Sequence, residues 1–165
     1  MTPFTASAPP ARPRQIAALI AWMLFAFSAS LSAAFGGPDA WYNDLAKPVW
    51  NPPGWIFGPV WSLLYGMMAV AAWQVWQIGG WRQQRRPLGL FVLQWVLNAA
   101  WTPLFFGLHR PGIALIEIAA LWLAISLTIH AFWRVRRTAA LLLIPYWLWV
   151  GFASGLNATL WWRNP

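Results

Sequence analysis

Long apolar stretches constrain this chain more than any other feature of its sequence. Five of them follow one another, separated by short segments rich in arginine or proline, and they cover about residues 16–36, 55–78, 87–107, 112–133 and 139–162. A helix that spans a bilayer needs about 20 apolar residues at a rise of about 1.5 Å each. The stretches are apolar on every face, whereas the strands of a membrane barrel would alternate. The sequence therefore predicts an all-α integral membrane protein, a bundle of five transmembrane helices.

The domain organisation follows from the same pattern. We expect one membrane domain over residues 16–165, in which residues 37–54 form a loop between the first two spans. Residues 1–15, rich in Pro, Ala and Ser, are predicted to be a disordered tail. Arg12 and Arg14 before an apolar stretch with a small-residue ending also fit a cleaved signal peptide. The length of that stretch favours a retained span.

The composition excludes a soluble globule and several kinds of chemistry. Only 8% of the residues are charged and 60% are apolar or aromatic, against roughly 25% charged in soluble domains. The net charge of +8 comes from residues in the gaps between spans, so it indicates membrane topology rather than a nucleic-acid partner. The absence of cysteine excludes disulfides, thiol catalysis and thiolate metal sites. The expected partner is the lipid bilayer.

The distribution of basic residues predicts the orientation. With the N-terminus inside, only three basic residues lie outside, namely Lys47, Arg110 and Arg163. The other eight lie inside: Arg12, Arg14, Arg82, Arg85, Arg86, Arg134, Arg136 and Arg137. Because cytoplasmic segments carry the excess of Lys and Arg, we expect the N-terminus inside and the C-terminus outside.

The loop between the first two spans is unusually aromatic and rich in proline. It begins the segment GPDAWYNDLAKPVWNPPGWIFGPVW (37–61), which includes Trp41 and Tyr42. Pro48, Pro52 and Pro53 fix their φ angles and stiffen the chain. An interfacial aromatic belt would explain part of this composition. A rigid lid over an aromatic pocket explains its stiffness as well, and is the interpretation we favour.

Polar residues inside the spans recur at helical spacing beside aromatic ones. The resulting stripes are Asn98, Trp101 and Phe105; Trp61, Tyr65 and Met68; and Tyr146, Trp149, Ala153 and Asn157. An asparagine amide is costly in hydrocarbon unless it is hydrogen-bonded, so Asn98 and Asn157 should point into the bundle. Their neighbours would then line an internal cavity suited to a large, flat, apolar ligand.

The remaining titratable residues do not form a catalytic or metal-binding group. Glu117 is the one acid at membrane depth, with a ligand or proton role as the alternative to a neutral carboxyl. His130 follows 13 residues later, about 20 Å along a helix, so the two cannot share a metal. His109 and His130 lie at opposite ends of the fourth span. No nucleophile–base pair, phosphate loop or carboxylate pair is present, so we expect a binding protein without a metal.

The motifs resemble those of the translocator protein family, whose bacterial members are called tryptophan-rich sensory proteins (TspO/MBR). They are WYNDLAKPVWNPPGWIFGPVWSLLY (41–65), LNAAWTPLFFG (97–107) and PYWLWVGFASGLN (145–157). The resemblance covers residues from about 16 to 164. It implies a homodimeric five-helix bundle in a bacterial membrane, with no required cofactor and with a porphyrin such as protoporphyrin IX as the bound ligand.

The resemblance also implies which residues contact that ligand. Carried over by motif, these are Trp41, Tyr42, Trp61, Asn98, Trp101, Trp149 and Ala153, and the helical stripes add Tyr65, Phe105 and Tyr146. Trp61 and Trp149 resemble the two tryptophans that bacterial relatives need for light-dependent porphyrin breakdown. The cholesterol motif of the animal members requires a Tyr between a Leu and an Arg, whereas this chain has Trp161 and Trp162 before Arg163. The resemblance therefore favours tetrapyrroles over sterols as ligands. A role in porphyrin sensing or trafficking is therefore expected, with photo-oxidative degradation or transport as alternatives.

Overall fold

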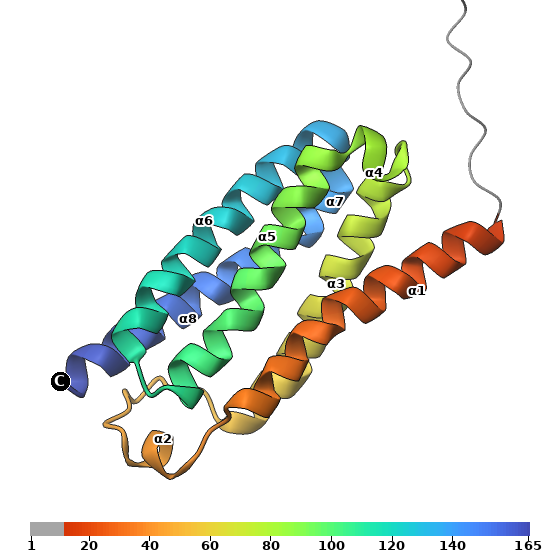
Figure 1. Cartoon of the computed structure of the whole chain (residues 1–165). Helices are drawn as coiled ribbons and strands as arrows, with labels where there is room; N and C mark the ends of the chain where they lie inside the picture. Colours follow the sequence, from red (N-terminus) through yellow and green to blue (C-terminus); the bar gives the residue numbers. More distant parts are fainter. Residues whose placement is uncertain (1–11) are drawn as a thin grey trace, which may run out of the picture.

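The computed structural model describes residues 12–165 and is helical throughout its long segments (Figure 1). Within that part of the chain, five helical segments are long and apolar enough to cross a membrane: Arg12–Phe35, Gly54–Trp76, Arg85–Gly107, Pro111–Val135 and Arg137–Arg163. They pack as an up-and-down bundle. The predicted all-α fold with five spans is confirmed.

The first span starts earlier than the sequence suggested. Its α-helix α1 (Arg12–Ser28) includes residues 12–15, which we had expected in the disordered tail; residues 1–11 lie outside the described part. The 3₁₀ segment η1 (Ala29–Phe35) continues the span. The hydroxyls of Ser28 and Ser30 donate to the carbonyls of Phe25 and Phe27, each at 2.7 Å, a bonding pattern that often bends helices.

Three of the other spans are composite. They are η2 (Gly54–Ile56) with α3 (Phe57–Trp76), α5 (Arg85–Thr102) with η3 (Pro103–Gly107), and α7 (Arg137–Leu142) with α8 (Ile144–Arg163). The fourth span is the single helix α6 (Pro111–Val135), and the short α4 (Gly80–Gln83) lies between the second and third spans. In the π-helical η3, the Leu108 N–H donates to the carbonyl of Pro103 at 2.9 Å, five residues back. Pro103 and Pro145 have no N–H to donate, which explains why the α-helical bonding changes near them.

The helices pack through small and aromatic side chains. α1 lies on α3, α5 packs against α6, α6 packs against α8, and α3 contacts α7. Ala69 and Ala72 of α3 are fully buried, and such small side chains let helices approach closely. Phe91 of α5 stacks on Phe132 of α6 with ring centroids 6.0 Å apart. α1 lies at the edge of the bundle in Figure 1.

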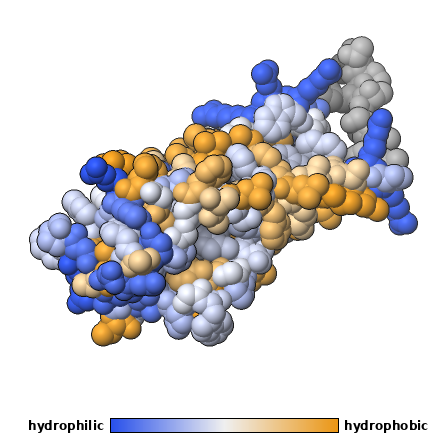
Figure 2. All heavy atoms as spheres, turned by 60° about the horizontal axis from the view of Figure 1, so that its bottom comes forward, coloured by the Kyte–Doolittle hydropathy of each residue, from blue (hydrophilic) through white to orange (hydrophobic). Residues whose placement is uncertain are grey.

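The two ends of the bundle differ in chemistry. The arginine end carries Arg82, Arg85, Arg86, Arg134, Arg136 and Arg137. The loop end carries the 37–54 loop together with the C-terminus (Figure 1). Figure 2 shows apolar side chains over the middle of one face and hydrophilic ones towards both ends, as a protein in a bilayer requires.

Candidate ligand-binding site

The 37–54 loop has a defined internal structure. It contains a short helix, α2 (Ala40–Asp44), which the sequence analysis did not predict. The Asp39 carboxylate caps this helix by accepting the Tyr42 N–H at 3.0 Å, a favourable arrangement at a helix N-terminus. Lys47 donates to the carbonyls of Tyr42 and Asn43 at the other end of α2, and its ammonium lies 4.6 Å from the Tyr42 ring centroid.

One side of the loop is fastened to the end of the chain. The Ala46 N–H donates to the side-chain oxygen of Asn164 at 2.9 Å. The Arg163 guanidinium donates to the carbonyl of Lys47 at 3.0 Å. Arg163, the last residue of α8, and Asn164, which follows it, therefore hold the middle of the loop. Pro48, next to this contact, is buried.

The other side of the loop is fastened to the turn between η3 and α6. His109 and the Asp39 carboxylate are 2.9 Å apart, and the His109 ring stacks on Trp41 with centroids 4.3 Å apart. At the same place the backbones of Gly36 and Gly107 touch. A Cβ on Gly107 would lie 2.5 Å from the carbonyl oxygen of Phe35, so this close approach requires glycine.

Aromatic side chains of the loop pack directly on η3. Trp41 and Tyr42 both meet the buried ring of Phe105, with centroids 5.8 Å and 6.3 Å away. Phe105 in turn stacks on Trp101 of α5 at 4.9 Å. Burial raises the pKa of the Tyr42 phenol, and a hydrogen bond to Asn51 opposes that effect. The loop thus contributes two predicted ligand residues to one continuous aromatic cluster.

A second cluster lies deeper, between α3, α5 and α8. The Tyr65 hydroxyl donates to the side-chain oxygen of Asn98 at 3.0 Å. Trp61 stacks on Tyr65 with centroids 5.3 Å apart and meets Tyr146 of α8 at 6.1 Å. Asn98 and Trp101 are one turn apart on α5, and Trp101 packs against both clusters.

Trp149 and Ala153 complete the predicted set from α8. Trp149 meets Phe57 at the start of α3, with centroids 5.8 Å apart. Its indole N–H is buried and has no hydrogen-bond partner among the described residues. Ala153 packs against the core one turn further along α8. One buried donor therefore lies in this region without an acceptor.

The structure brings the ten predicted residues into adjoining clusters, packed against one another. Three cavities of about 370, 470 and 370 Å³ lie elsewhere: between α5 and α6 at the arginine end, on the α6–α8 face, and near the end of α8. None of these three is lined by a predicted ligand residue. The indole-lined cavity expected from the sequence stays a prediction, and forming it requires these rings to separate.

Several residues that shape this region escaped the sequence analysis. Phe106 packs on both Tyr42 and Trp101, with centroids 5.2 Å and 5.8 Å away. The Asp39–His109 and Ala46–Asn164 contacts join residues 70 and 118 positions apart. Nothing local in a single sequence marks such pairs. The one signal for Phe106 in the sequence is the pair of phenylalanines in the LFFG motif.

Comparison with known proteins identifies the family. Residues 16–163 match the TspO/MBR family. The chain belongs to the TspO/MBR family. The tryptophan-rich protein TspO of Chlorobaculum tepidum is 46% identical to it over 132 residues, which are 78% of this chain and 82% of that relative.

Relatives within the TspO/MBR family extend to animals. The tryptophan-rich sensory protein of Cereibacter sphaeroides is 40% identical over 120 residues, 73% of this chain and 74% of its own. The human translocator protein is 41% identical over 126 residues, 75% of each chain. This TspO/MBR protein is thus an integral membrane protein, and its relatives include a tryptophan-rich sensory protein and a translocator protein.

Proposed function

We propose that this protein binds a tetrapyrrole of the protoporphyrin IX class between the 37–54 loop and the spans α3, α5 and α8. The supporting observation is the convergence of indole and phenyl rings from four elements around two amides, Asn98 and Asn157. A porphyrin is flat and aromatic, and each ring stacked on it adds about 0.5–1.5 kcal/mol beyond area burial.

An unpartnered donor gives the proposed ligand a polar contact. The Trp149 indole N–H lacks an acceptor in the described residues. A buried donor without an acceptor costs about 1–3 kcal/mol. A ligand oxygen or ring nitrogen that accepted this bond would recover the cost, so the site favours a ligand with acceptors over a pure hydrocarbon.

Entry of such a ligand requires the 37–54 loop to move. The predicted residues contact one another, and the loop is tied at two edges, to His109 and to Arg163 and Asn164. Opening one edge would part Trp41 and Tyr42 from Phe105 without unfolding the spans. Binding would then select an open conformation that the fastened loop disfavours.

Porphyrin sensing, regulation or trafficking is the role we propose for this binding. Light-dependent degradation is the second candidate, favoured by the positions of Trp61 and Trp149 within the proposed site. A bound porphyrin would act as sensitiser and dioxygen as oxidant of the macrocycle. Counting porphyrins consumed per chain under illumination separates the two, because only an enzyme turns over repeatedly without losing its indoles.

A fluorescence titration tests the binding. Protoporphyrin IX added to the detergent-purified protein should quench tryptophan emission saturably. Ala153→Thr should weaken binding about tenfold or more, because a β-branched side chain overpacks the wall. Trp22→Phe, on α1 against Phe25 and Phe91, is the control and should bind normally. Equal affinity of all three proteins would refute the site.

We also propose that the arginine end faces the cytoplasm of a bacterium and that two copies associate. The support for orientation is the concentration of arginines at one end. A reporter fused after Pro165 should be active only outside the cytoplasm. We infer the homodimer from the family resemblance. Light scattering in detergent, which measures the mass of the assembled protein, tests it.

A further inference from the structure

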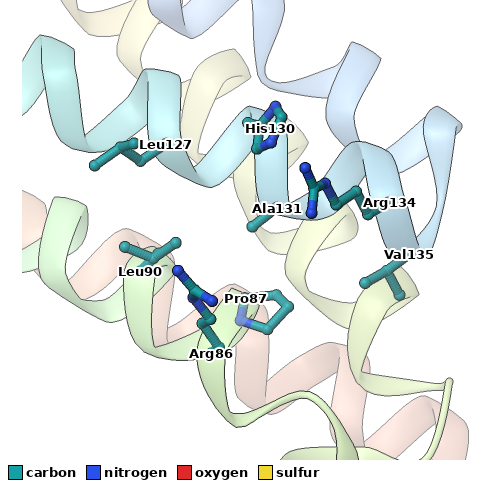
Figure 3. Close-up of a pocket in the computed structure, with 8 residues that line it drawn as sticks. All are labelled: Arg86, Pro87, Leu90, Leu127, His130, Ala131, Arg134 and Val135. Atoms are coloured by element: carbon teal, nitrogen blue, oxygen red, sulfur yellow. The ribbon is translucent and has the colours of Figure 1, made fainter.

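A groove opens between α5 and α6 at the arginine end, far from the 37–54 loop. It has a volume of about 370 Å³ and is lined by Arg86, Pro87, Leu90, Leu127, His130, Ala131, Arg134 and Val135. Figure 3 shows Arg86 extending from α5 into the gap between the helices, with His130 and Arg134 on α6 opposite. We propose that this groove binds an acidic phospholipid of the surrounding leaflet.

The charges of the groove have no counter-ion in the protein. The three acids of the chain are Asp39, Asp44 and Glu117. The first two lie in the loop at the opposite end, and Glu117 is 13 residues before His130 on α6, about 20 Å away. No hydrogen bond or ion pair joins the side chain of Arg86 or Arg134 to another described residue. Both side chains are exposed, so an anion from outside the protein can reach and balance them.

Neighbouring arginines are not equivalent to these two. Arg136 donates to the side-chain oxygen of Gln77 at 3.5 Å, and Arg137 lies over the Trp133 ring at 5.7 Å. Arg86 and Arg134 instead converge on one groove from two helices, and the first turn of α5 beside them has no side-chain N-cap. Guanidinium groups and the positive end of a helix are both favourable surroundings for a phosphate.

The apolar walls specify a lipid rather than a free anion. Leu90 lies one turn from Arg86 along α5, and Leu127 lies seven residues from Arg134 on α6, about 10 Å deeper in the bilayer. Ala131 leaves room between them. A phosphate held at the rim by arginines would thus have its acyl chain beside leucines. Basic pockets between spans on the cytoplasmic side bind acidic headgroups by this combination.

Native mass spectrometry of the intact protein in non-ionic detergent tests the proposal. Dioleoylphosphatidylglycerol should bind as a discrete adduct, and dioleoylphosphatidylcholine should bind at least tenfold more weakly. The double substitution Arg86→Gln with Arg134→Gln should lower phosphatidylglycerol affinity about 30-fold. The matched control is Arg82→Gln with Arg85→Gln, which removes the same charge at the same end and should change affinity less than threefold. Equal losses in both pairs would overturn the site.

Two further arms keep the outcome decisive. Ala131→Phe leaves every charge in place but fills the groove, so it should also abolish the discrete adduct even if the glutamine variants fail to fold. Inorganic phosphate at 10 mM should leave most phosphatidylglycerol bound. Full displacement by phosphate would indicate a site for free anions, and unchanged binding in Ala131→Phe would indicate a lipid at another surface; either result refutes the proposal.

Discussion

The indole N–H of Trp101 on α5 donates a hydrogen bond to the side-chain oxygen of Asn157 on α8, 3.1 Å away. The side-chain nitrogen of the same Asn157 donates to the carbonyl of Pro111, where α6 begins, at 2.8 Å. Asn157 is buried, so these bonds replace those its amide would make to water. One side chain therefore joins three spans close to the 37–54 loop.

Replacing Asn157 should consequently loosen the bundle. We expect Asn157→Leu to lower the free energy of unfolding by about 1 kcal/mol, since the Trp101 indole and the Pro111 carbonyl each lose a hydrogen bond to the Asn157 amide. Reversible unfolding in mixed micelles with increasing dodecyl sulfate measures this change. Thr159→Ala is the matched control on α8, because that exposed hydroxyl bonds only the carbonyl of Gly155 in its own helix. Equal stability of both variants would contradict the assigned role.

Trp149 allows binding and photochemistry to be separated. Trp149→Phe keeps a flat ring against Phe57, so protoporphyrin affinity should stay within about threefold of the wild type. The oxidisable indole is lost, and illuminated loss of porphyrin absorbance should slow at least several-fold. Trp22→Phe should change neither quantity. If the two variants behave alike in both assays, Trp149 lies outside the functional site.

The prolines of the loop should matter for affinity more than for folding. Pro52→Ala with Pro53→Ala frees two φ angles and adds about 1–2 kcal/mol of ordering cost. In the open conformation proposed above, the variant loop is less ordered, so closing it on protoporphyrin costs more and binding should weaken about fivefold to thirtyfold. The helix content of the spans, measured by circular dichroism, should not change. Val49→Ala in the same loop is the control, because the Val49 side chain is fully exposed. Unchanged affinity in the proline variant would indicate that the loop is only an aromatic belt at the membrane interface and not a lid over the site.

The touching backbones of Gly36 and Gly107 give a fourth prediction. Gly107→Ala places a methyl against the carbonyl oxygen of Phe35 and should destabilise the protein by about 1–3 kcal/mol. Gly155→Ala, where a Cβ meets nothing within 4 Å, should be neutral or slightly stabilising. Thermal melting of both variants in one detergent decides the comparison, and similar melting temperatures would contradict the prediction.

The Asp39–His109 contact should make fastening of the loop sensitive to acid. The hydrogen bond from the Tyr42 N–H lowers the pKa of Asp39 below its ordinary value of 3.8; desolvation opposes this, and His109 adds to the lowering. Because the folded pKa is depressed, the stabilisation is present above 3.8 and is lost as pH falls through the folded value. We expect the loop to stay fastened at pH 5–7 and to loosen only below about pH 4.

A spin label can follow that loosening, since the chain has no cysteine of its own. A label on Val49→Cys is fully exposed, so the motion of the loop backbone sets its mobility, which should increase as the pH falls below about 4. Adding Asp39→Ala should mobilise it at pH 7, whereas Asp44→Asn should not, because the Asp44 side chain has no hydrogen bond or ion pair with a described residue. A label equally mobile in all three proteins would show that Asp39 does not fasten the loop.

The spans were predictable because their cause is local. A stretch such as residues 112–133 is apolar enough to require a bilayer whatever it packs against. Asn98 and Asn157 were also predictable, since a bilayer leaves an amide no alternative to an internal partner. Which partners they take was not, because Tyr65 and Pro111 meet them only through the packing of whole helices.

The same distinction explains what the sequence missed in the site. Pro103 was visible, but the close approach of Gly107 in η3 to the carbonyl of Phe35 in η1 was not. The partnership of Asp39 with His109 depends on the loop folding back over the end of α5. Long-range contacts of this kind carry no period or spacing that one sequence reveals.

The bonds from Arg163 and Asn164 to the loop also impose an order on biogenesis. The loop leaves the ribosome behind the first span, whereas its anchors Arg163 and Asn164 are synthesised 116 and 118 residues after the loop residues that they hold. Until Arg163 and Asn164 have emerged, Trp41 and Tyr42 have no finished support on that side. A nascent chain whose fifth span is still in the ribosome would hold an unfastened loop, so ligand competence should arise only after that span has inserted.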